Sequence, residues 1–295
     1  MRVARETAKL REALAGRRRD GATIGLVPTM GALHDGHVSL VREARRTCDV
    51  VVVTLFVNPA QFGPGEDLAA YPRTEEADLA LLAAESVDLV FAPEPDEVYP
   101  TGFATTVAVG GLTDVLCGDP QRRGPGHFAG VTTVVAKLFN VAEPDVAFFG
   151  QKDAQQVAVI RRMARDLDFP VRIEVLPTVR EPDGLALSSR NRYLDADERR
   201  RAAALHRALE AARSTATAGA PVAEAIDAAR SELAAEGIDP EYVEARDAED
   251  LTPAESFNGR PILVALAARV GPARLIDNIV IEPEGELEAR CTATC

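Results

Sequence analysis

Short runs of consecutive apolar residues alternate along the chain with stretches in which apolar residues recur every three or four positions. The continuous runs predict strands that are buried on both faces, at residues 23–28, 50–57, 88–92, 145–149 and 171–176. The periodic stretches predict helices between them, at residues 38–46, 74–84, 131–141 and 154–167. Because strands that alternate with helices form βαβ units, we expect an α/β fold with a parallel sheet.

The pattern changes after residue 190. Two alanine-rich stretches predict helices at residues 197–214 and 222–236, and three alternating stretches predict antiparallel strands at residues 242–246, 262–270 and 275–281. We therefore expect two domains, residues 1–178 and a smaller α+β domain at 179–295. The acidic tail from about residue 284 is predicted to be disordered.

Composition and charge exclude several functions. The 295 residues carry a net charge of −13, which argues against nucleic-acid binding and against docking on an anionic membrane. No pair of cysteines has CxxC spacing, so no zinc or redox motif is indicated. Residues 1–19 are charged and lack the apolar core of a signal peptide, and no apolar run reaches about 18 residues. We expect a cytoplasmic protein.

Ligands of a parallel sheet bind at the carboxyl ends of its strands, so the loops after the strands are the first candidates. The loop at residues 28–37 reads PTMGALHDGH and contains His34 and His37 as His-x-Gly-His. His37 falls on the first turn of a predicted helix, where N–H groups attract anions, and Gly36 allows a ligand to approach the backbone closely. The alternatives are a structural turn or a metal site with two histidine ligands.

A second strand-end loop, at residues 149–156, reads FGQKDAQQ. Lys152 is one of only three lysines and suits a phosphate contact. Gln156 lies on the same helical face as Lys152 and Asp153, where its amide can bind a substrate hydroxyl or carboxylate. The alternative is a helix start with a solvated lysine.

A third loop, at residues 183–191, reads DGLALSSRN and lies at the domain boundary. Ser188 and Ser189 provide hydroxyl groups, and the Arg190 guanidinium can bridge two phosphates. An ordinary loop that starts a helix is the alternative. Taken with the two loops above, the segment indicates a group of residues that grips phosphates.

Three further stretches carry weaker signals. Asn58 and Gln61, in FVNPAQF at residues 56–62, suit a small polar organic substrate; a plain turn is the alternative. The basic loop RRGPGHF at residues 122–128 suits a carboxylate or phosphate contact, or is merely solvated. Asp78 can assist a Mg²⁺ ion held by phosphates, although a solvated helix face explains it as well.

These loops together resemble the pantoate–β-alanine ligase family (pantothenate synthetases) over nearly the whole chain. Five segments carry the resemblance in the family's order, at residues 28–37, 56–62, 149–153, 183–191 and 273–278, the last reading ARLIDN. His-x-Gly-His alone is shared by a wider nucleotidyltransferase superfamily that includes class I aminoacyl-tRNA synthetases. The resemblance implies a Rossmann-like ATP-binding domain and a smaller C-terminal lid domain, usually as a homodimer.

The resemblance also implies the reaction. Pantoate attacks the α-phosphorus of MgATP to give pantoyl adenylate and pyrophosphate, and the amine of β-alanine then displaces AMP to give pantothenate. ATP is thus a substrate, with Mg²⁺ beside it, and pantoate and β-alanine are the other partners.

Site residues follow from the matching positions. The implied catalytic residues are those that hold the triphosphate: His34, His37, Lys152, Ser188, Ser189 and Arg190. The implied ATP contacts are these six together with Pro28, Met30, Gly36, Phe149, Gly150, Asp153 and Val179. Pantoate is assigned to Gln61, Gln156 and Asn58, and Mg²⁺ to Asp78. The chain departs from the family pattern at Gln151, where the family has Glu, and at Gly124, which separates the arginines from PGHF.

Two other classes of function stay open at this point. One is a tRNA-charging or other nucleotidyl-transfer enzyme that grips phosphates in the same way, although the charge of −13 and the absence of an anticodon domain count against tRNA. The other is a nucleotide-binding module without catalysis. The release of AMP, and its dependence on pantoate, distinguishes all three.

Overall fold

The computed structural model describes residues 1–283, which form two compact units. The first consists of Met1–Gln151 and Val159–Val179, and the second of Lys152–Ala158 and the residues from Arg180 onward. The predicted tail, with Cys291 and Cys295, lies outside the described residues. The roles expected of residues 1–178 in binding and of residues 179–295 as a lid stay predictions.

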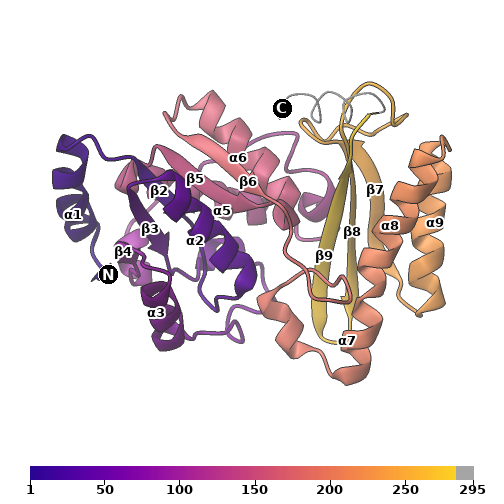
Figure 1. Cartoon of the computed structure of the whole chain (residues 1–295), viewed down its shortest axis with the longest axis horizontal. Helices are drawn as coiled ribbons and strands as arrows, with labels where there is room; N and C mark the ends of the chain where they lie inside the picture. The colour runs from indigo at the N-terminus through magenta and orange to yellow at the C-terminus, as the bar shows by residue number, and fades with distance from the viewer. Residues whose placement is uncertain (284–295) are drawn as a thin grey trace. The chain divides into compact units, whose positions relative to one another are not determined.

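The first unit is built on a six-stranded sheet in which every neighbouring pair is parallel (Figure 1). Its order is β1-β4-β3-β2-β5-β6. The strands are β1 (Arg2–Ala4), β2 (Ile24–Val27), β3 (Val50–Thr54), β4 (Leu89–Phe91), β5 (Val146–Gly150) and β6 (Arg172–Leu176). The predicted α/β fold with a Rossmann-like parallel sheet is confirmed.

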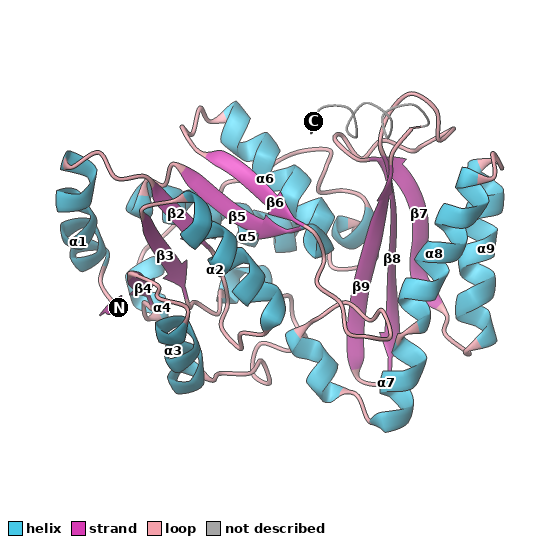
Figure 2. Cartoon of the chain, viewed as in Figure 1, coloured by secondary structure: helices cyan, strands magenta, loops and turns pink. Residues whose placement is uncertain are grey.

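Helices surround this sheet (Figure 2). They are α1 (Thr7–Arg19), α2 (Asp35–Thr47), α3 (Glu75–Ala84), the short α4 (Pro95–Val98), α5 (Pro125–Ala142) and α6 (Ala154–Asp166). Strand β1 and helix α1 were not predicted, because β1 has three residues and α1 buries only Leu10 and Leu14. Helix α5 begins six residues earlier than predicted, with a proline in its first turn, so His127 lies on a helix and not in a loop.

Both faces of the sheet are covered. Val51 and Val53 of β3 pack in one cluster with Val41 of α2 and Leu82 of α3. The alternate residue Val52, which points to the opposite face, has no exposed surface either. Because neither face meets water, the strand has no polar alternation, which is why its sequence is a continuous apolar run.

The direction in which strands are added reverses next to β2. The chain runs from β2 to β3 and β4 on one side, whereas β5 and β6 lie on the other side of β2. Ligands of open parallel sheets bind beside the strand ends at such a switch point. The loops that leave β2 and β5 are those with His-x-Gly-His and with Lys152, so the topology favours the predicted loops as a binding site.

The second unit is a three-stranded antiparallel sheet covered by helices on one face. Its strands, in the order β7-β8-β9, are β7 (Pro240–Asp247), β8 (Ile262–Val270) and β9 (Ala273–Ile281). Its helices are α7 (Ala196–Ala202), α8 (Ala204–Thr217) and α9 (Val222–Ala235). Leu209 of α8, Leu233 of α9 and Leu266 of β8 share its core. The predicted helix at 197–214 is in fact two helices, α7 and α8, that meet at Ala203.

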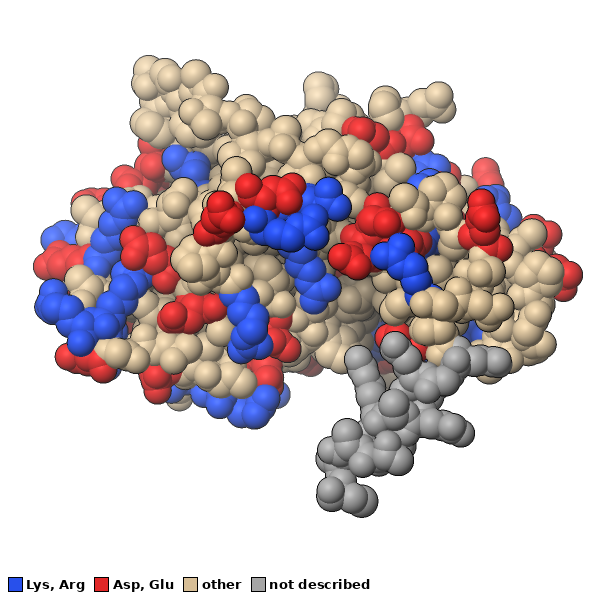
Figure 3. Space-filling view, turned by 90° about the horizontal axis from the view of Figure 1, so that it is seen from above, with Lys and Arg blue, Asp and Glu red and all other residues tan. Residues whose placement is uncertain are grey.

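Charged side chains of both signs are intermixed on the face shown in Figure 3. Ion pairs join some of the charged residues of the described chain, such as Arg42 with Glu85 and Arg46 with Glu43. In the described chain, none of the helices has the length and hydropathy needed to cross a bilayer.

His206 of α8 gives the second unit a specific pH dependence. Within the described residues, its buried Nδ1 atom has no hydrogen-bond partner. Burial, and then the charge of Arg180, lower the pKa of His206 below 6.5. The unfolded chain therefore binds a proton here more readily than the folded chain, so stability increases with pH through this window.

We expect the free energy of unfolding to fall as the pH is lowered below about 6.5, and to fall less in His206→Gln, which cannot take up that proton. Urea unfolding of both proteins at pH 7.5, 6.5 and 5.5 measures this difference. The same loss on acidification in both proteins would contradict the role given to His206.

Candidate active site

The His-x-Gly-His segment joins β2 to α2, as predicted, and its two histidines cap the helix. His34 is the N-cap residue, and its Nδ1 atom accepts a hydrogen bond from the Gly36 amide at 3.2 Å. His37 lies three residues later, and its Nδ1 atom accepts from the His34 amide at 3.4 Å. This is a reciprocal capping box in which imidazoles replace the usual hydroxyl and carboxylate.

The caps fix which nitrogen of each ring carries the proton. Because both Nδ1 atoms accept hydrogen bonds, the proton of each neutral ring lies on Nε2. The ring centroids of His34 and His37 are 4.1 Å apart. The pair therefore presents two Nε2–H donors side by side at a helix N-terminus, which suits the oxygens of a phosphate group.

A buried carboxylate holds the turn that precedes these histidines. Gly31 and Ala32 have φ angles of 79° and 52°, and the second is strained for a residue with a side chain. Asp78, in the first turn of α3, is 4% exposed, and its two oxygens accept from the amides of Ala32 and Leu33, both at 2.9 Å. Its oxygens also lie 3.2 Å from the Thr74 hydroxyl. These bonds compensate for the strain and fix the path of the loop.

The carboxyl ends of β2 and β3 are joined by two threonines. The Thr29 amide donates to the Thr54 hydroxyl at 3.0 Å, and the Thr29 hydroxyl donates to the Thr54 carbonyl at 2.5 Å. Both residues are buried. The loop that leads to His34 and His37 thus starts from a hydrogen-bonded edge of the sheet.

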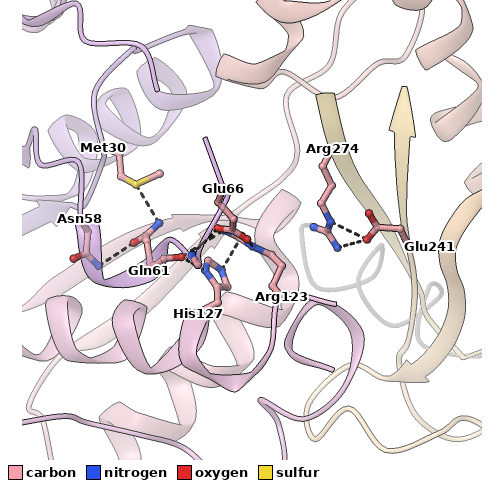
Figure 4. A network of polar contacts seen from close by, with 9 residues as sticks. Met30, Asn58, Gln61, Glu66, Arg123, His127, Glu241 and Arg274 are labelled. Carbon is pink, nitrogen blue, oxygen red and sulfur yellow. Dashed lines mark hydrogen bonds and ion pairs between the residues drawn. The ribbon is translucent and has the colours of Figure 1, made fainter. Parts of the chain in front are cut away.

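Asn58 is 1% exposed, and Figure 4 shows the contact between its side chain and that of Gln61. Its side-chain amide donates to the Gln61 side chain and to the Gly130 carbonyl, both at 3.1 Å. Its oxygen accepts from the Tyr99 hydroxyl at 2.7 Å and from the Ala60 amide at 3.2 Å. Burial raises the pKa of Tyr99 to about 12, so this hydroxyl keeps its proton and remains a donor at neutral pH.

Both the side chain and the backbone carbonyl of Gln61 make hydrogen bonds. Its side-chain amide donates to the Met30 sulfur at 3.1 Å, so this predicted pantoate ligand reaches the loop that contains His34 (Figure 4). Its carbonyl accepts from Nδ1 of His127 at 2.7 Å, and the other ring nitrogen of His127 accepts from Arg123 at 3.1 Å. Gln61 is therefore fixed in position before any ligand binds.

The arginines of the predicted basic loop contact the protein itself. Arg123 makes a two-point ion pair with Glu66, at 2.6 and 2.7 Å. Burial raises the pKa of the Glu66 carboxyl, but the hydrogen bond and charge of Arg123 outweigh it, so this pKa is below its usual value. Arg122 donates to the Leu116 carbonyl at 2.9 Å. A ligand contact by either arginine stays a prediction.

The second unit contains the other predicted phosphate ligands. Lys152 belongs to a single 3₁₀ turn, η3 (Gln151–Asp153), directly before α6, and its ammonium is 3.8 Å from the Asp153 carboxylate. The side chain of Lys152 is 20% exposed. Gln156 follows on α6 and is half-buried. Lys152 thus belongs to the turn directly before the N-terminus of α6, and both a positive charge and a helix N-terminus favour an anionic ligand.

Ser188, Ser189 and Arg190 also belong to one local structure. Ser188 is the N-cap of the 3₁₀ helix η4 (Ser189–Tyr193), and its hydroxyl accepts from the Arg190 amide at 3.3 Å. Ser189 is buried. The loop is therefore a helix start, as the structural alternative proposed, and this does not conflict with phosphate binding.

The described residues do not support a bound metal as the purpose of these groups. No set of three His, Cys, Asp or Glu side chains in residues 1–283 could hold a metal ion. The Nδ1 atoms of His34 and His37 serve the helix cap, and the carboxylate of Asp78 accepts from backbone amides. Asp78 does not fit a direct Mg²⁺ ligand well, so its predicted contact with the ion stays a prediction.

Three positioning residues were missed in the sequence. Tyr99, Glu66 and Gly130 hold Asn58 and Arg123, yet none of them stands next to its partner in the chain. The sequence offers little to mark them: Tyr99 directly follows the short helix α4, and Gly130 lies within helix α5. Such contacts depend on tertiary structure, so sequence spacing does not reveal them.

We expect Asp78→Asn to lower the free energy of unfolding by about 1–3 kcal/mol, because an amide can accept from only one of the two backbone N–H groups that Asp78 now satisfies. Amide hydrogen exchange should be faster at Ala32 and Leu33. Glu76→Gln, an exposed change of the same kind on the same helix, is the matched control. Equal stability of the two variants would show that Asp78 does not anchor the loop.

Comparison with known proteins identifies the family. The family model described as pantoate-beta-alanine ligase matches residues 2–280. A pantothenate synthetase of Moorella thermoacetica is 53% identical over 286 residues, which cover 96% of this chain and 99% of that protein. One from Paramagnetospirillum magneticum is 52% identical over 282 residues, covering 95% and 98%.

Solved structures give the same result. Pantothenate synthetase from Thermus thermophilus superimposes with a TM-score of 0.89 at 49% identity, covering 96% of this chain and 100% of that one. A ligase from Francisella tularensis, complexed with β-γ ATP and β-alanine, superimposes with a TM-score of 0.77 at 32% identity, covering 95% and 97%. With its parallel sheet, its imidazole-capped helix and these matches, the chain belongs to the pantoate–β-alanine ligase family.

Proposed function

We propose that this chain condenses pantoate with β-alanine in an ATP-dependent reaction that passes through pantoyl adenylate. Membership of the family supports this, as does the relative from Francisella tularensis that was complexed with β-γ ATP and β-alanine. The observation that carries the proposal is the reciprocal cap of His34 and His37. It places two Nε2–H donors at the start of α2, beside the switch point of the sheet.

The first half-reaction forms a bond between a carboxylate oxygen of pantoate and the α-phosphorus of ATP. The bond from that phosphorus to the β-phosphate oxygen breaks, and pyrophosphate leaves with the electron pair. Because the carboxylate is already ionised, no general base is needed. The protein's task is to neutralise the charge that builds up on phosphate oxygens, and His34 and His37 donate hydrogen bonds to those oxygens.

Residues of the second unit neutralise the triphosphate. Lys152 and Arg190 provide positive charge, and Ser188 and Ser189 provide hydroxyl donors. The remaining contacts to ATP in this proposal are made by Pro28, Met30, Gly36, Phe149, Gly150, Asp153 and Val179. The half-buried state of Lys152 supports its role, because a partly desolvated ammonium attracts an anion more strongly than a fully hydrated one.

Pantoate is bound by Gln61 and Gln156. The four protein contacts of Asn58 suit it to hold Gln61 in place, and we assign it to the pantoate site through that contact. In the second half-reaction the amine of β-alanine attacks the acyl carbon of pantoyl adenylate. An amide bond forms, the amine loses a proton, and AMP leaves.

Magnesium enters this scheme with the nucleotide, held by the phosphates of MgATP, since carboxylate-rich metal clusters are absent from residues 1–283. Asp78 then acts on the loop that carries the histidines. We further propose that the enzyme works as a homodimer in the cytoplasm, as other members of the family imply. Two cysteines of the described chain, Cys48 and Cys117, are reduced and buried, which is compatible with that compartment.

The proposed function predicts AMP release only when ATP, pantoate and β-alanine are all present, and formation of pyrophosphate from ATP and pantoate without β-alanine. His34→Ala or Lys152→Ala should each lower the rate of adenylate formation by about 10²-fold or more, because each removes a group that stabilises the transition-state charge. Chromatography of nucleotides after single-turnover mixing measures both products.

Lys9→Ala, a change at an exposed lysine of α1 that lies outside the proposed site, is the control and should keep the wild-type rate. AMP formed with an amino acid in place of pantoate would favour another nucleotidyl-transfer enzyme. Nucleotide binding without AMP in any mixture would favour a non-catalytic module, and a near-wild-type rate in either alanine variant would refute the assignment.

Gly130 predicts a separate effect on pantoate. A Cβ atom at Gly130 of α5 would collide with the backbone of Ala60 and Gln61. We expect Gly130→Ala to raise the KM for pantoate by about 10-fold and to leave the KM for ATP within about two-fold, because it displaces the backbone of Ala60 and Gln61, neither of which is a proposed ATP contact. Gly126→Ala on the same helix meets no atom within 4 Å and is the matched control. Parallel changes in both KM values would mean a general loss of structure.

A further inference from the structure

We propose that Asp277 and Asn278, adjacent residues of β9, position the two phosphate-binding segments of the second unit. Asn278 holds the turn with Lys152, and Asp277 holds the loop that leads to Ser188, Ser189 and Arg190. This inference rests on the proposed function, because it assigns these two residues to the same site. They are positioning residues, since they act through other groups.

Asn278 contacts the Lys152 turn directly. Its side-chain amide donates to the Lys152 carbonyl at 2.8 Å, across 126 residues of sequence. Asn278 is 4% exposed. The turn η3 is a single 3₁₀ turn, which has few hydrogen bonds of its own to fix its orientation. A buried amide on a sheet strand therefore gives the backbone of Lys152 a fixed point from which its ammonium is directed.

Asp277 holds the other segment through Arg180. Its carboxylate is 1% exposed and makes a two-point ion pair with the Arg180 guanidinium, at 2.6 and 3.0 Å. Arg180 also donates to the Gly184 carbonyl at 3.0 Å and lies 3.4 Å from the carbonyl of Asn278. The ion pair thus connects β9 to the start of the loop at residues 183–191.

The loop is folded tightly between this ion pair and the serines. Arg180 and Ala186 form an antiparallel bridge, and the side chain of Asn191 donates to the Ala186 carbonyl at 3.0 Å. Gly184 has a φ of 91° and lies so close to the ring of His206 that a Cβ atom there would collide with it. A shift of Arg180 would consequently be passed on to the segment that begins at Ser188.

The two residues serve different segments because they point to opposite faces of one strand. Asp277 follows the alternation of Ala273 and Leu275, which belong to the core under α8, so its charge lies on an otherwise apolar face. Asn278 points to the other face, toward the segment that begins at Lys152. Asp277 and Asn278 are two consecutive buried polar residues in the largely apolar strand β9. The ion pair with Arg180 accounts for the first, and the hydrogen bond to the Lys152 carbonyl accounts for the second.

The decisive test is a pair of double-mutant cycles. In the first, Asn278→Leu keeps the size of the side chain and removes the donor. We expect it to slow adenylate formation by about 10-fold with the KM for pantoate unchanged, and to have less than about a two-fold effect when Lys152 is already Ala. In the second, Asp277→Asn should slow the reaction in the wild type but not in Arg190→Ala.

A residue needed only for folding would lower the rate by the same factor in both backgrounds, because its effect would not depend on the phosphate ligand. Additive losses in either cycle, or a wild-type rate in both single variants, overturn the proposal. Circular dichroism and thermal unfolding confirm that each variant is folded. Should Asn278→Leu fail to fold, Asn278→Ala takes its place in the cycle.

The same cycles are run on binding, with the affinity for α,β-methylene-ATP measured by titration calorimetry. This readout does not need turnover, so it tests the positioning role even if wild-type protein releases no AMP and the proposed function fails. Non-additive losses of affinity support the role, and additive ones overturn it. Glu241→Gln is the matched control. Glu241 belongs to β7, and this change weakens its contact with Arg274, which lies on β9 like Asp277 and Asn278 (Figure 4). The change does not touch Lys152 or Arg180, so the variant should keep the wild-type rate and affinity.

Discussion

The bonds between one buried carboxylate and two backbone amides fix the loop that leads to the proposed site in the first unit. Asp78 holds Ala32 in a strained left-handed conformation, and the loop fixed in this way leads to His34 at the N-cap of α2. A charged group inside a protein is costly unless its charge is balanced by donors. Here the two amides balance it, and the same bonds carry the strain of the turn.

The histidine pair shows how one structural element can satisfy folding and chemistry at once. A helix start needs acceptors for its first amides, and a phosphate needs donors. In His34 and His37 each ring accepts with Nδ1 and carries its proton on Nε2, so a single neutral side chain supplies both. A serine or aspartate cap would satisfy the helix but would leave no comparable donor toward the ligand.

Polar side chains around the site are mostly engaged with one another and not with open solvent. Asn58 and Tyr99 orient Gln61, and Asp277 and Asn278 orient segments of the second unit. In the proposed function, such supporting contacts limit the motion of the groups that would meet the ligand, which reduces the entropy lost when the transition state forms. They also explain why buried polar residues occur within apolar strands and helices.

The sequence alone determined the α/β class, the parallel sheet, the strand-end loops and the identity of the candidate phosphate ligands. Hydrophobic period and the position of Gly, His and Lys after a strand are local properties, so they can be read along the chain. Three features were not determined in this way. Helix α1 buries only two residues, which is too few to give a clear hydrophobic period, and the start of α5 at Pro125 and the break at Ala203 each depend on a single residue. The tautomer of the histidines follows from the local geometry of the helix cap, which only the structure shows. Tertiary structure alone decided the anchoring of their loop by Asp78 and the contact of Asn278 with Lys152. The last two join residues 46 and 126 positions apart, and pairing over such distances depends on how the whole unit packs.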